Sequence, residues 1–132
     1  LINERCQATF DVASIEFGEN SFWVFQDIGY EIKCKLNNPV NELEDRLVQE
    51  GWNCSPFPEE MVKEILSDTA FRREMYQLNN STKSYWLYLD VDALRNGKKD
   101  DRMSAFQYRT PHYLVALYIP EDNVLYYLEY SI

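Results

Sequence analysis

Apolar and polar side chains alternate in several short stretches of this chain, and a period of two predicts half-exposed β-strands. The clearest stretch is residues 30–36, YEIKCKL. One of its faces carries Tyr30, Ile32, Cys34 and Leu36, and the other carries Glu31, Lys33 and Lys35. We expect the charged face to meet water. Two further strands are predicted within 8–17 and 21–26, on either side of the turn-forming segment GEN.

The middle of the chain has the spacing of amphipathic helices. Apolar residues recur at helical spacing after residue 38, namely Val40, Leu43 and Leu47. Asn38 suits a capping position and Pro39 suits a first turn, so a helix is predicted over about 39–50. Gly51 is its expected C-cap, with Trp52 folded back against the helix. A second helix is predicted over about 58–67, and 69–77 either continues it or forms a third.

Residues 112–119 and 124–131 flank the polar segment PEDN, which predicts a C-terminal β-hairpin. If Ile119 lies opposite Val124, one face of the hairpin is strongly apolar. Its members are Tyr113, Val115, Leu117, Ile119, Val124, Tyr126, Leu128 and Tyr130. The other face is mixed and pairs His112 with Ser131. A slip of one residue would mix the two sets, so the pattern favours this register.

Residues 85–92, YWLYLDVD, are apolar on both faces, which is typical of a central strand. The polar segment 93–105 is expected to be an exposed loop, followed by a short strand around 106–109. Together these elements predict one α+β domain over 1–132. Its mainly antiparallel sheet has about five strands, with two or three helices packed on one face. The second sheet face is expected to carry aromatic, partly polar side chains.

The net charge is −9, from 22 acidic and 13 basic side chains, and it disfavours direct binding to nucleic acids or anionic membranes. The sequence has no apolar run of 18 residues, so membrane attachment would require a segment outside it. The chain begins with Leu1, as expected either for a fragment that has lost a targeting segment or for a cleaved tag.

Few residues suggest chemistry. Asp90 and Asp92 alternate along a predicted strand, so they are weak candidates for binding a shared cation or for a catalytic acid. The sequence has no calcium-loop spacing. We therefore predict neither a metal site nor a cofactor. His112, the single histidine, is expected opposite Ser131, where a hydrogen-bonded boundary role is commoner than a catalytic one. Cys34 and Cys54 either pair in an oxidising compartment or leave Cys34 as a small buried hydrophobe.

A family resemblance adds a location. The segments FWVF and EIK, then GWNCSPFPEEM, YWLYLD and the terminal YLVALYIPEDNVLYYLEYSI, resemble in order a group of short, uncharacterised proteins of Gram-positive bacteria, over about residues 20–132. Those proteins typically carry one N-terminal membrane anchor or signal, followed by an external domain of about this size. The resemblance implies an extracytoplasmic domain, membrane-anchored or secreted, and the alternative is a cytoplasmic one.

The sequence leads to three hypotheses about function. The leading hypothesis is a non-enzymatic domain that binds a peptide, a glycan or a protein partner through the aromatic sheet face, with Trp86, Tyr88, Tyr118 and Tyr127 as its binding residues. The first alternative is an acidic cytoplasmic antagonist, either a toxin-immunity protein or a nucleic-acid mimic. The second alternative is a hydrolase that uses Asp90 or His112.

Overall fold

The computed structural model describes residues 10–17, 22–24, 27–67, 69–92 and 112–131. Seven strands form one sheet: β1 (Val12–Phe17), β2 (Phe22–Val24), β3 (Asp27–Leu36), β4 (Asn53–Cys54), β5 (Tyr85–Asp90), β6 (His112–Ile119) and β7 (Val124–Ser131). Helices α2 (Val40–Gln49), α3 (Glu59–Ile65) and α4 (Ala70–Ser81) complete the described elements. The α+β class is confirmed, with more strands than the predicted five. The expected loop at 93–105 and strand around 106–109 lie outside the described residues.

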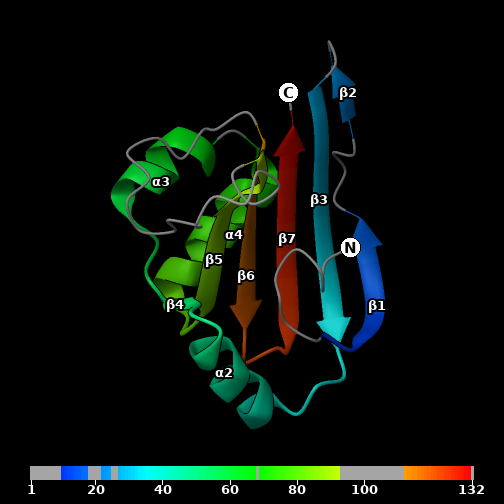
Figure 1. Ribbon diagram of the computed structural model, residues 1–132, viewed down its shortest axis with the longest axis vertical. Helices are drawn as coiled ribbons and strands as arrows, with labels where there is room; N and C mark the ends of the chain where they lie inside the picture. The colour runs from blue at the N-terminus through cyan, green and yellow to red at the C-terminus, as the bar shows by residue number, and fades with distance from the viewer. Residues whose placement is uncertain (1–9, 18–21, 25–26, 68, 93–111, 132) are drawn as a thin grey trace.

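The sheet is antiparallel throughout, in the order β1-β3-β7-β6-β5-β4, and β2 pairs with the first part of β3. The C-terminal strand β7 therefore lies in the middle of the sheet, between β3 and β6 (Figure 1). At the two ends of the order are β1, which is six residues long, and β4, which is two.

The predicted hairpin register is confirmed from Ile119 opposite Val124 to His112 opposite Ser131. Its loop ends at Asn123, which adopts a left-handed backbone conformation with φ of 51°. The Asn123 side chain accepts a hydrogen bond from the Tyr118 hydroxyl (2.6 Å) and donates to the carbonyls of Leu36 and Asn38 (3.0 Å each). These bonds fasten the hairpin loop to the end of β3.

Helix α2 ends as the sequence predicts but begins differently. Gly51 takes the left-handed conformation with φ of 84°, and the N–H of Trp52 donates to the carbonyl of Leu47, which closes the helix in a Schellman motif. At the start, Asn38 does not cap the helix. Its side-chain oxygen instead accepts a hydrogen bond from the N–H of Asp11 (2.7 Å), so it joins the segment before β1 to the segment after β3.

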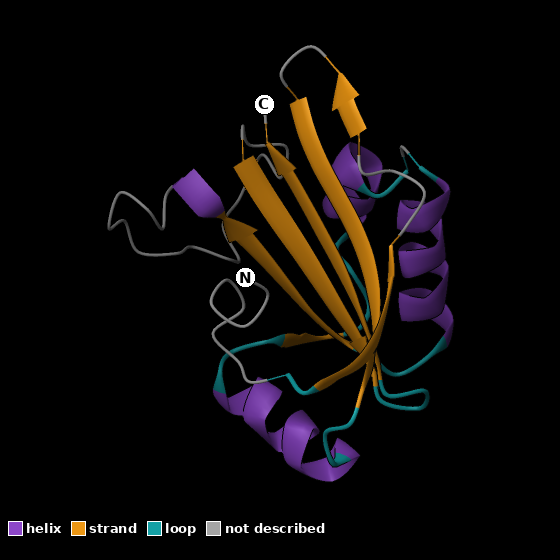
Figure 2. Cartoon of the chain, turned by 90° about the vertical axis from the view of Figure 1, so that its right-hand side faces the viewer, coloured by secondary structure: helices purple, strands orange, loops and turns teal. Residues whose placement is uncertain are grey.

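The helices cover both faces of the sheet. Helices α3 and α4 pack on one face through Met61, Ile65 and Met75, as predicted, whereas α2 packs on the opposite face through Leu43 and Leu47. Figure 2 shows α2 and α4 on opposite sides of the sheet. The prediction of a single covered face is therefore wrong for residues 39–50. The physical reason is that β5, β6 and β7 are apolar on both faces, and each apolar face must be shielded from water.

The charged face of β3 meets water only in part. Lys35 is exposed and Lys33 is half-buried, but Glu31 has 0% of its surface exposed, because the start of α4 covers it. The Thr69 hydroxyl, which caps α4 by accepting from the N–H of Arg72, donates a hydrogen bond to Oε2 of Glu31 (2.7 Å). The alternation along β3 is correct, but Glu31 is buried and Lys33 is half-buried where exposure was expected, and Tyr30 on the opposite face has 40% of its surface exposed.

Candidate functional site

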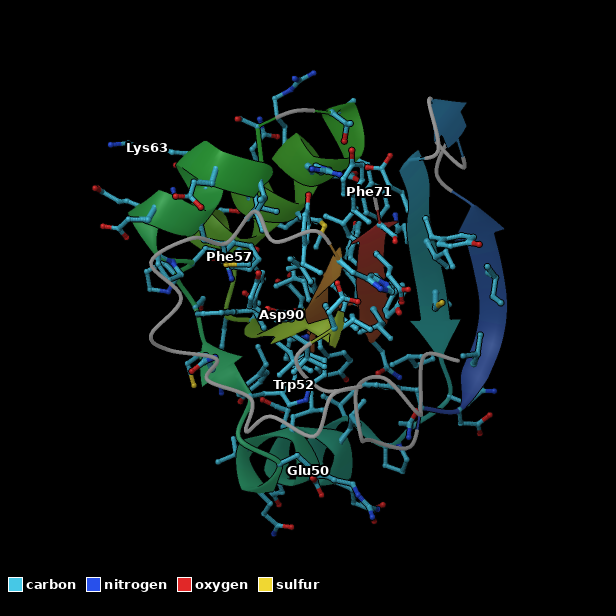
Figure 3. All side chains as sticks on the ribbon, turned by 45° about the horizontal axis from the view of Figure 1, so that its top comes forward. Glu50, Trp52, Phe57, Lys63, Phe71 and Asp90 are labelled. Atoms are coloured by element: carbon cyan, nitrogen blue, oxygen red, sulfur yellow. The ribbon has the colours of Figure 1, made fainter. Side chains whose placement is uncertain are left out.

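The predicted aromatic binding surface is absent. Trp86 and Tyr88 lie on the face covered by α3 and α4, whereas Tyr118 and Tyr127 lie on the opposite face, and all four side chains are buried. The pairing of β5 with β6 explains the division, because Tyr118 lies opposite Tyr85 and Trp86 lies opposite Leu117. Trp86 packs against Phe57, which lies between α3 and the sheet (Figure 3), with ring centroids 5.6 Å apart. All four side chains belong to the core, so the prediction that they bind a partner is wrong.

The two aspartates do not form a shared cation site. Asp90 is the last residue of β5 and lies opposite Tyr113, whereas Asp92 lies in a helical turn and its carboxylate is 3.7 Å from Nδ1 of His112. Within the described residues, no group of three or more His, Cys, Asp or Glu side chains is arranged to hold a metal ion. The helical turn after β5 breaks the alternation on which the pairing of Asp90 with Asp92 depended.

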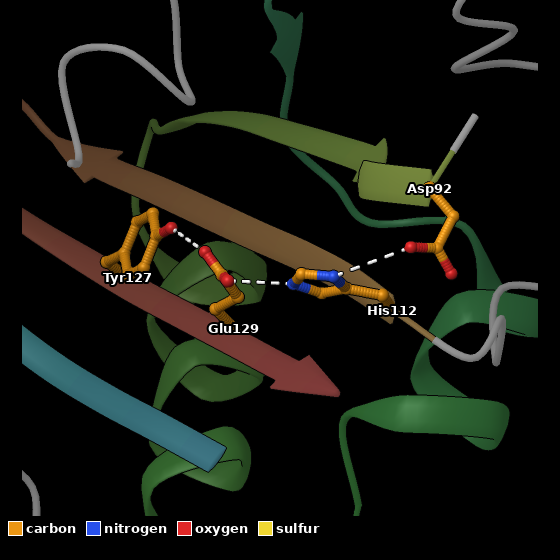
Figure 4. Close-up of polar contacts among 4 residues, drawn as sticks. All are labelled: Asp92, His112, Tyr127 and Glu129. Carbon is orange, nitrogen blue, oxygen red and sulfur yellow. Dashed lines mark hydrogen bonds and ion pairs between the residues drawn. The ribbon is translucent and has the colours of Figure 1, made fainter. Parts of the chain in front are cut away.

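His112 belongs to a buried polar network on the α2 side of the sheet (Figure 4). Its Nε2 lies 2.8 Å from Oε2 of Glu129, and Oε1 of Glu129 accepts a short hydrogen bond from the Tyr127 hydroxyl. The two ring nitrogens of His112 thus face two carboxylates, those of Glu129 and Asp92. Ser131 lies opposite His112 in the hairpin, but a serine nucleophile needs a ring nitrogen to accept its proton, whereas Nε2 is bonded to Glu129 and Nδ1 faces the carboxylate of Asp92.

The His112 network has a clear structural role. It joins residues of β6 and β7 to the turn that follows β5, and it surrounds the buried Glu129 carboxylate with an imidazole and a phenol. Burial of a carboxylate is costly unless hydrogen bonds satisfy it, and the network supplies them. The arrangement supports a hydrogen-bonded boundary histidine, as the sequence favoured, and it offers little to the hydrolase hypothesis.

The two described cysteines, Cys34 and Cys54, are free, so they do not form the bridge considered as one alternative. Cys34 is fully buried, and burial raises the pKa of its thiol. The alternative interpretation of Cys34 as a small buried hydrophobe agrees with this position.

Exposed carboxylates are divided between the two sides of the molecule. Glu42 and Asp45 lie on α2, and Glu59 and Glu60 lie on α3, on the opposite side of the sheet. A mimic of nucleic acid or a neutraliser of a basic protein needs its negative charge on one continuous surface. The observed distribution does not favour the antagonist hypothesis.

The open end of the sheet has a different character. Residues 12–15 of β1, here called the β1 edge, are all exposed, and in the described part of the chain β1 pairs only with β3. Two of the four are apolar and β-branched: Val12 and Ile15, with 36% and 49% of their surfaces exposed. The β1 edge therefore presents a strand with an apolar side chain available for contact.

A cleft of about 220 Å³ extends from Ser14 of the β1 edge across β3 and β7 to α4. We call it the lysine cleft; its polar lining consists of Ser14, Lys33, Lys35, Asp122 and Tyr126, and Leu78 of α4 contributes an apolar wall. The ammonium of Lys33 lies 5.5 Å from the centroid of the Tyr126 ring. Burial, and to a lesser degree the charge of Glu74, raises the pKa of Tyr126, while Lys33 opposes the shift.

Sequence reasoning did not find the lysine cleft. It assigned Lys33 and Lys35 to a water-facing strand surface, which gave no reason to connect them to Ser14 or Tyr126. The available signal was the spacing of two cationic residues on one face of a strand in an otherwise acidic chain.

Comparisons with protein-family models, with curated protein sequences and with solved structures gave no match to this chain. In the described part of the chain, none of the helices has the length and apolar character needed to cross a bilayer. Function must therefore be inferred from the geometry of the chain itself.

Proposed function

We propose that this protein is a non-enzymatic binding domain that recognises an extended segment of a partner protein at the β1 edge. The observation that carries the proposal is the exposed row of residues 12–15 on β1, which lies at one end of the sheet among the strands that the structure describes. A terminal strand presents backbone N–H and C=O groups to which an added strand can bond, and several peptide-binding domains use this mode.

The two ends of the sheet are not equivalent. Proteins commonly protect sheet edges with very short strands or with charged side chains. Strand β4 has two residues and is a poor template, whereas β1 has six and exposes Ile15. An irregularity between Val12 and Ser14 interrupts the β1–β3 register, so the part of the edge that follows it, around Ser14 and Ile15, is the better place for an added strand.

The partner is a peptide or protein segment and not a glycan. Glycan binding relies on exposed aromatic faces, and the four aromatic residues expected to supply them are buried in the core. The proposal retains an extracytoplasmic location, which rests on the resemblance in strand and turn pattern alone. It requires no metal ion or cofactor.

The test uses a soluble peptide in which glutamate and valine alternate, and it follows the backbone amide signals of the labelled protein by NMR. We expect the largest shifts in β1 and β3. The variant Ile15→Lys places a charge on the edge and is expected to weaken binding about tenfold or more, because an edge lysine opposes strand addition.

Val48→Lys is the matched control, since Val48 is an exposed apolar residue of α2, with 56% of its surface exposed, remote from β1. It should bind as the wild type does. Shifts confined to the helices, or equal binding by both variants, would contradict strand addition at β1.

A further inference from the structure

We propose that the lysine cleft recognises an anionic side chain, carboxylate or phosphoryl, on the segment that pairs with the β1 edge. This inference rests on the proposed strand addition and specifies the chemistry of the partner. It predicts a segment in which anionic and apolar residues alternate.

The geometry follows from strand pairing. Ser14 lies opposite Lys35 in the β1–β3 ladder, so the two side chains share the sheet face that α4 partly covers. Directly paired residues point to the same face, so the residue of an added strand opposite Ser14 also points to that face. Adjacent strands lie about 4.8 Å apart, which puts the added strand about 10 Å from β3. A lysine on its four-carbon stem and a glutamate can meet across β1 over this distance.

The cleft offers an available ammonium group to an anion that approaches from β1. Lys35 is exposed and therefore available at low desolvation cost, while Lys33 is held beside the Tyr126 ring. Leu78, Ile119 and Val124 supply apolar lining. These residues lie on the far side of β3 from β1, so a glutamate of the added strand would meet the ammonium of Lys35 at the β1 side of the cleft.

At the lysine cleft, the nearby lysines affect the binding of an anion more than the net charge of the molecule does. The overall charge of −9 opposes an anionic partner, but at physiological ionic strength the field of distant carboxylates is screened beyond about 8 Å. Asp122 also lines the cleft and reduces its positive charge. We therefore expect recognition of one anionic side chain and not of a polyanion.

The neighbouring positions of the added strand point to the other face of the sheet. There they meet Ile15, which lies opposite Cys34 and exposes about half of its surface. An apolar residue at these positions would bury that surface. The two faces together specify the alternation of anionic and apolar residues.

The experiment compares three peptides of one length, in which valine alternates with glutamate, with glutamine or with phosphoserine. Dissociation constants are measured for the wild type, for Lys35→Gln, and for Lys63→Gln as the control. Lys63 is exposed and points away from α3 (Figure 3), far from the cleft. Both substitutions remove one surface cation, so their effect on net charge is the same, and thermal unfolding confirms that each variant folds.

For the wild type we expect the glutamate peptide to bind about threefold to tenfold more tightly than the glutamine peptide, as for a partly exposed ion pair. Lys35→Gln should abolish this preference and Lys63→Gln should retain it. Tighter binding of the phosphoserine peptide than of the glutamate peptide identifies a phosphoryl group as the preferred anion, and the reverse order identifies a carboxylate.

Two results overturn the inference while the proposed function stands: equal binding of glutamate and glutamine peptides to the wild type with shifts in β1, or a glutamate preference that survives in Lys35→Gln. Absence of any shift in β1 with all three peptides instead removes the proposed function itself. The two failures are therefore distinguishable.

Discussion

Asn123 offers the sharpest test of how the hairpin is fastened to the rest of the sheet. Its side chain makes three hydrogen bonds, one with the Tyr118 hydroxyl and two with the carbonyls of Leu36 and Asn38, and its backbone is left-handed with φ of 51°. Two substitutions separate these contributions. Asn123→Gly deletes the side chain but tolerates the backbone conformation, and Asn123→Ala deletes the side chain and opposes the conformation.

The magnitudes follow from the contacts. Each hydrogen bond contributes about 1 kcal/mol net, so Asn123→Gly is expected to lower the free energy of unfolding by about 3 kcal/mol. Asn123→Ala should lose about 1 kcal/mol more, because a left-handed residue with a Cβ is strained. A domain of this size has about 5–15 kcal/mol in total, so both effects are large.

The assay is equilibrium unfolding in urea, followed by tryptophan fluorescence, since Trp52 and Trp86 are buried and report loss of the core. Tyr118→Phe in the Asn123→Gly background should add little, because the partner of the hydroxyl is already gone. If Asn123→Gly changes stability by less than about 0.5 kcal/mol, the loop is not fastened through this side chain and the reasoning is refuted.

Three further predictions concern buried polar and thiol groups. Tyr127→Phe removes a hydrogen bond to the buried Glu129 carboxylate and should cost about 2 kcal/mol in the same urea assay; an unchanged midpoint would contradict it. Burial raises the pKa of Tyr118 to about 12, from an ordinary value of about 10, so the folded state favours the neutral phenol. The stability of the protein should therefore fall as the pH rises from about 10 to 12. In thermal unfolding measured over this pH range, Tyr118→Phe should show a smaller fall. A thiol-alkylating reagent, followed by peptide mass spectrometry, should label the exposed Cys54 in the native protein and the buried Cys34 only after unfolding, and equal labelling rates would count against this fold.

Much of the fold is predictable because the C-terminal half of the chain encodes its register in side-chain polarity. The hairpin has one strongly apolar face, and a one-residue slip would destroy it, so Ile119 opposite Val124 is the only pairing that separates the two sets. The C-terminal end of α2 shows the same local control. Gly51 closes the helix through its own backbone, and no distant contact is required.

The candidate site was not predictable for a physical reason. Trp86 and Tyr127 are amphipathic, and their sequence positions do not reveal which sheet face each occupies until β5 is paired with β6. Burial of Glu31 depends on Thr69, which is 38 positions away in the sequence. Asn38 does not cap α2 as expected, because its side chain bonds to the N–H of Asp11 instead. Such long-range polar contacts leave no periodic signal in the sequence.

The β1 edge was not predicted, because alternation in the sequence does not indicate which position a strand takes in its sheet. Alternation around Val12 predicts a strand equally well at the centre or at the end. Only the order β1-β3-β7-β6-β5-β4 leaves Ile15 exposed and aligns Ser14 with the lysine cleft.

The central claim is that an extended partner segment pairs with β1, and intermolecular nuclear Overhauser effects test it most directly. With labelled protein and the unlabelled peptide that alternates glutamate and valine, we predict backbone-to-backbone effects between the peptide and residues 12–15. Contacts from the peptide to the surface of α3 and α4 in place of β1, or none at all at saturating peptide, would contradict the claim.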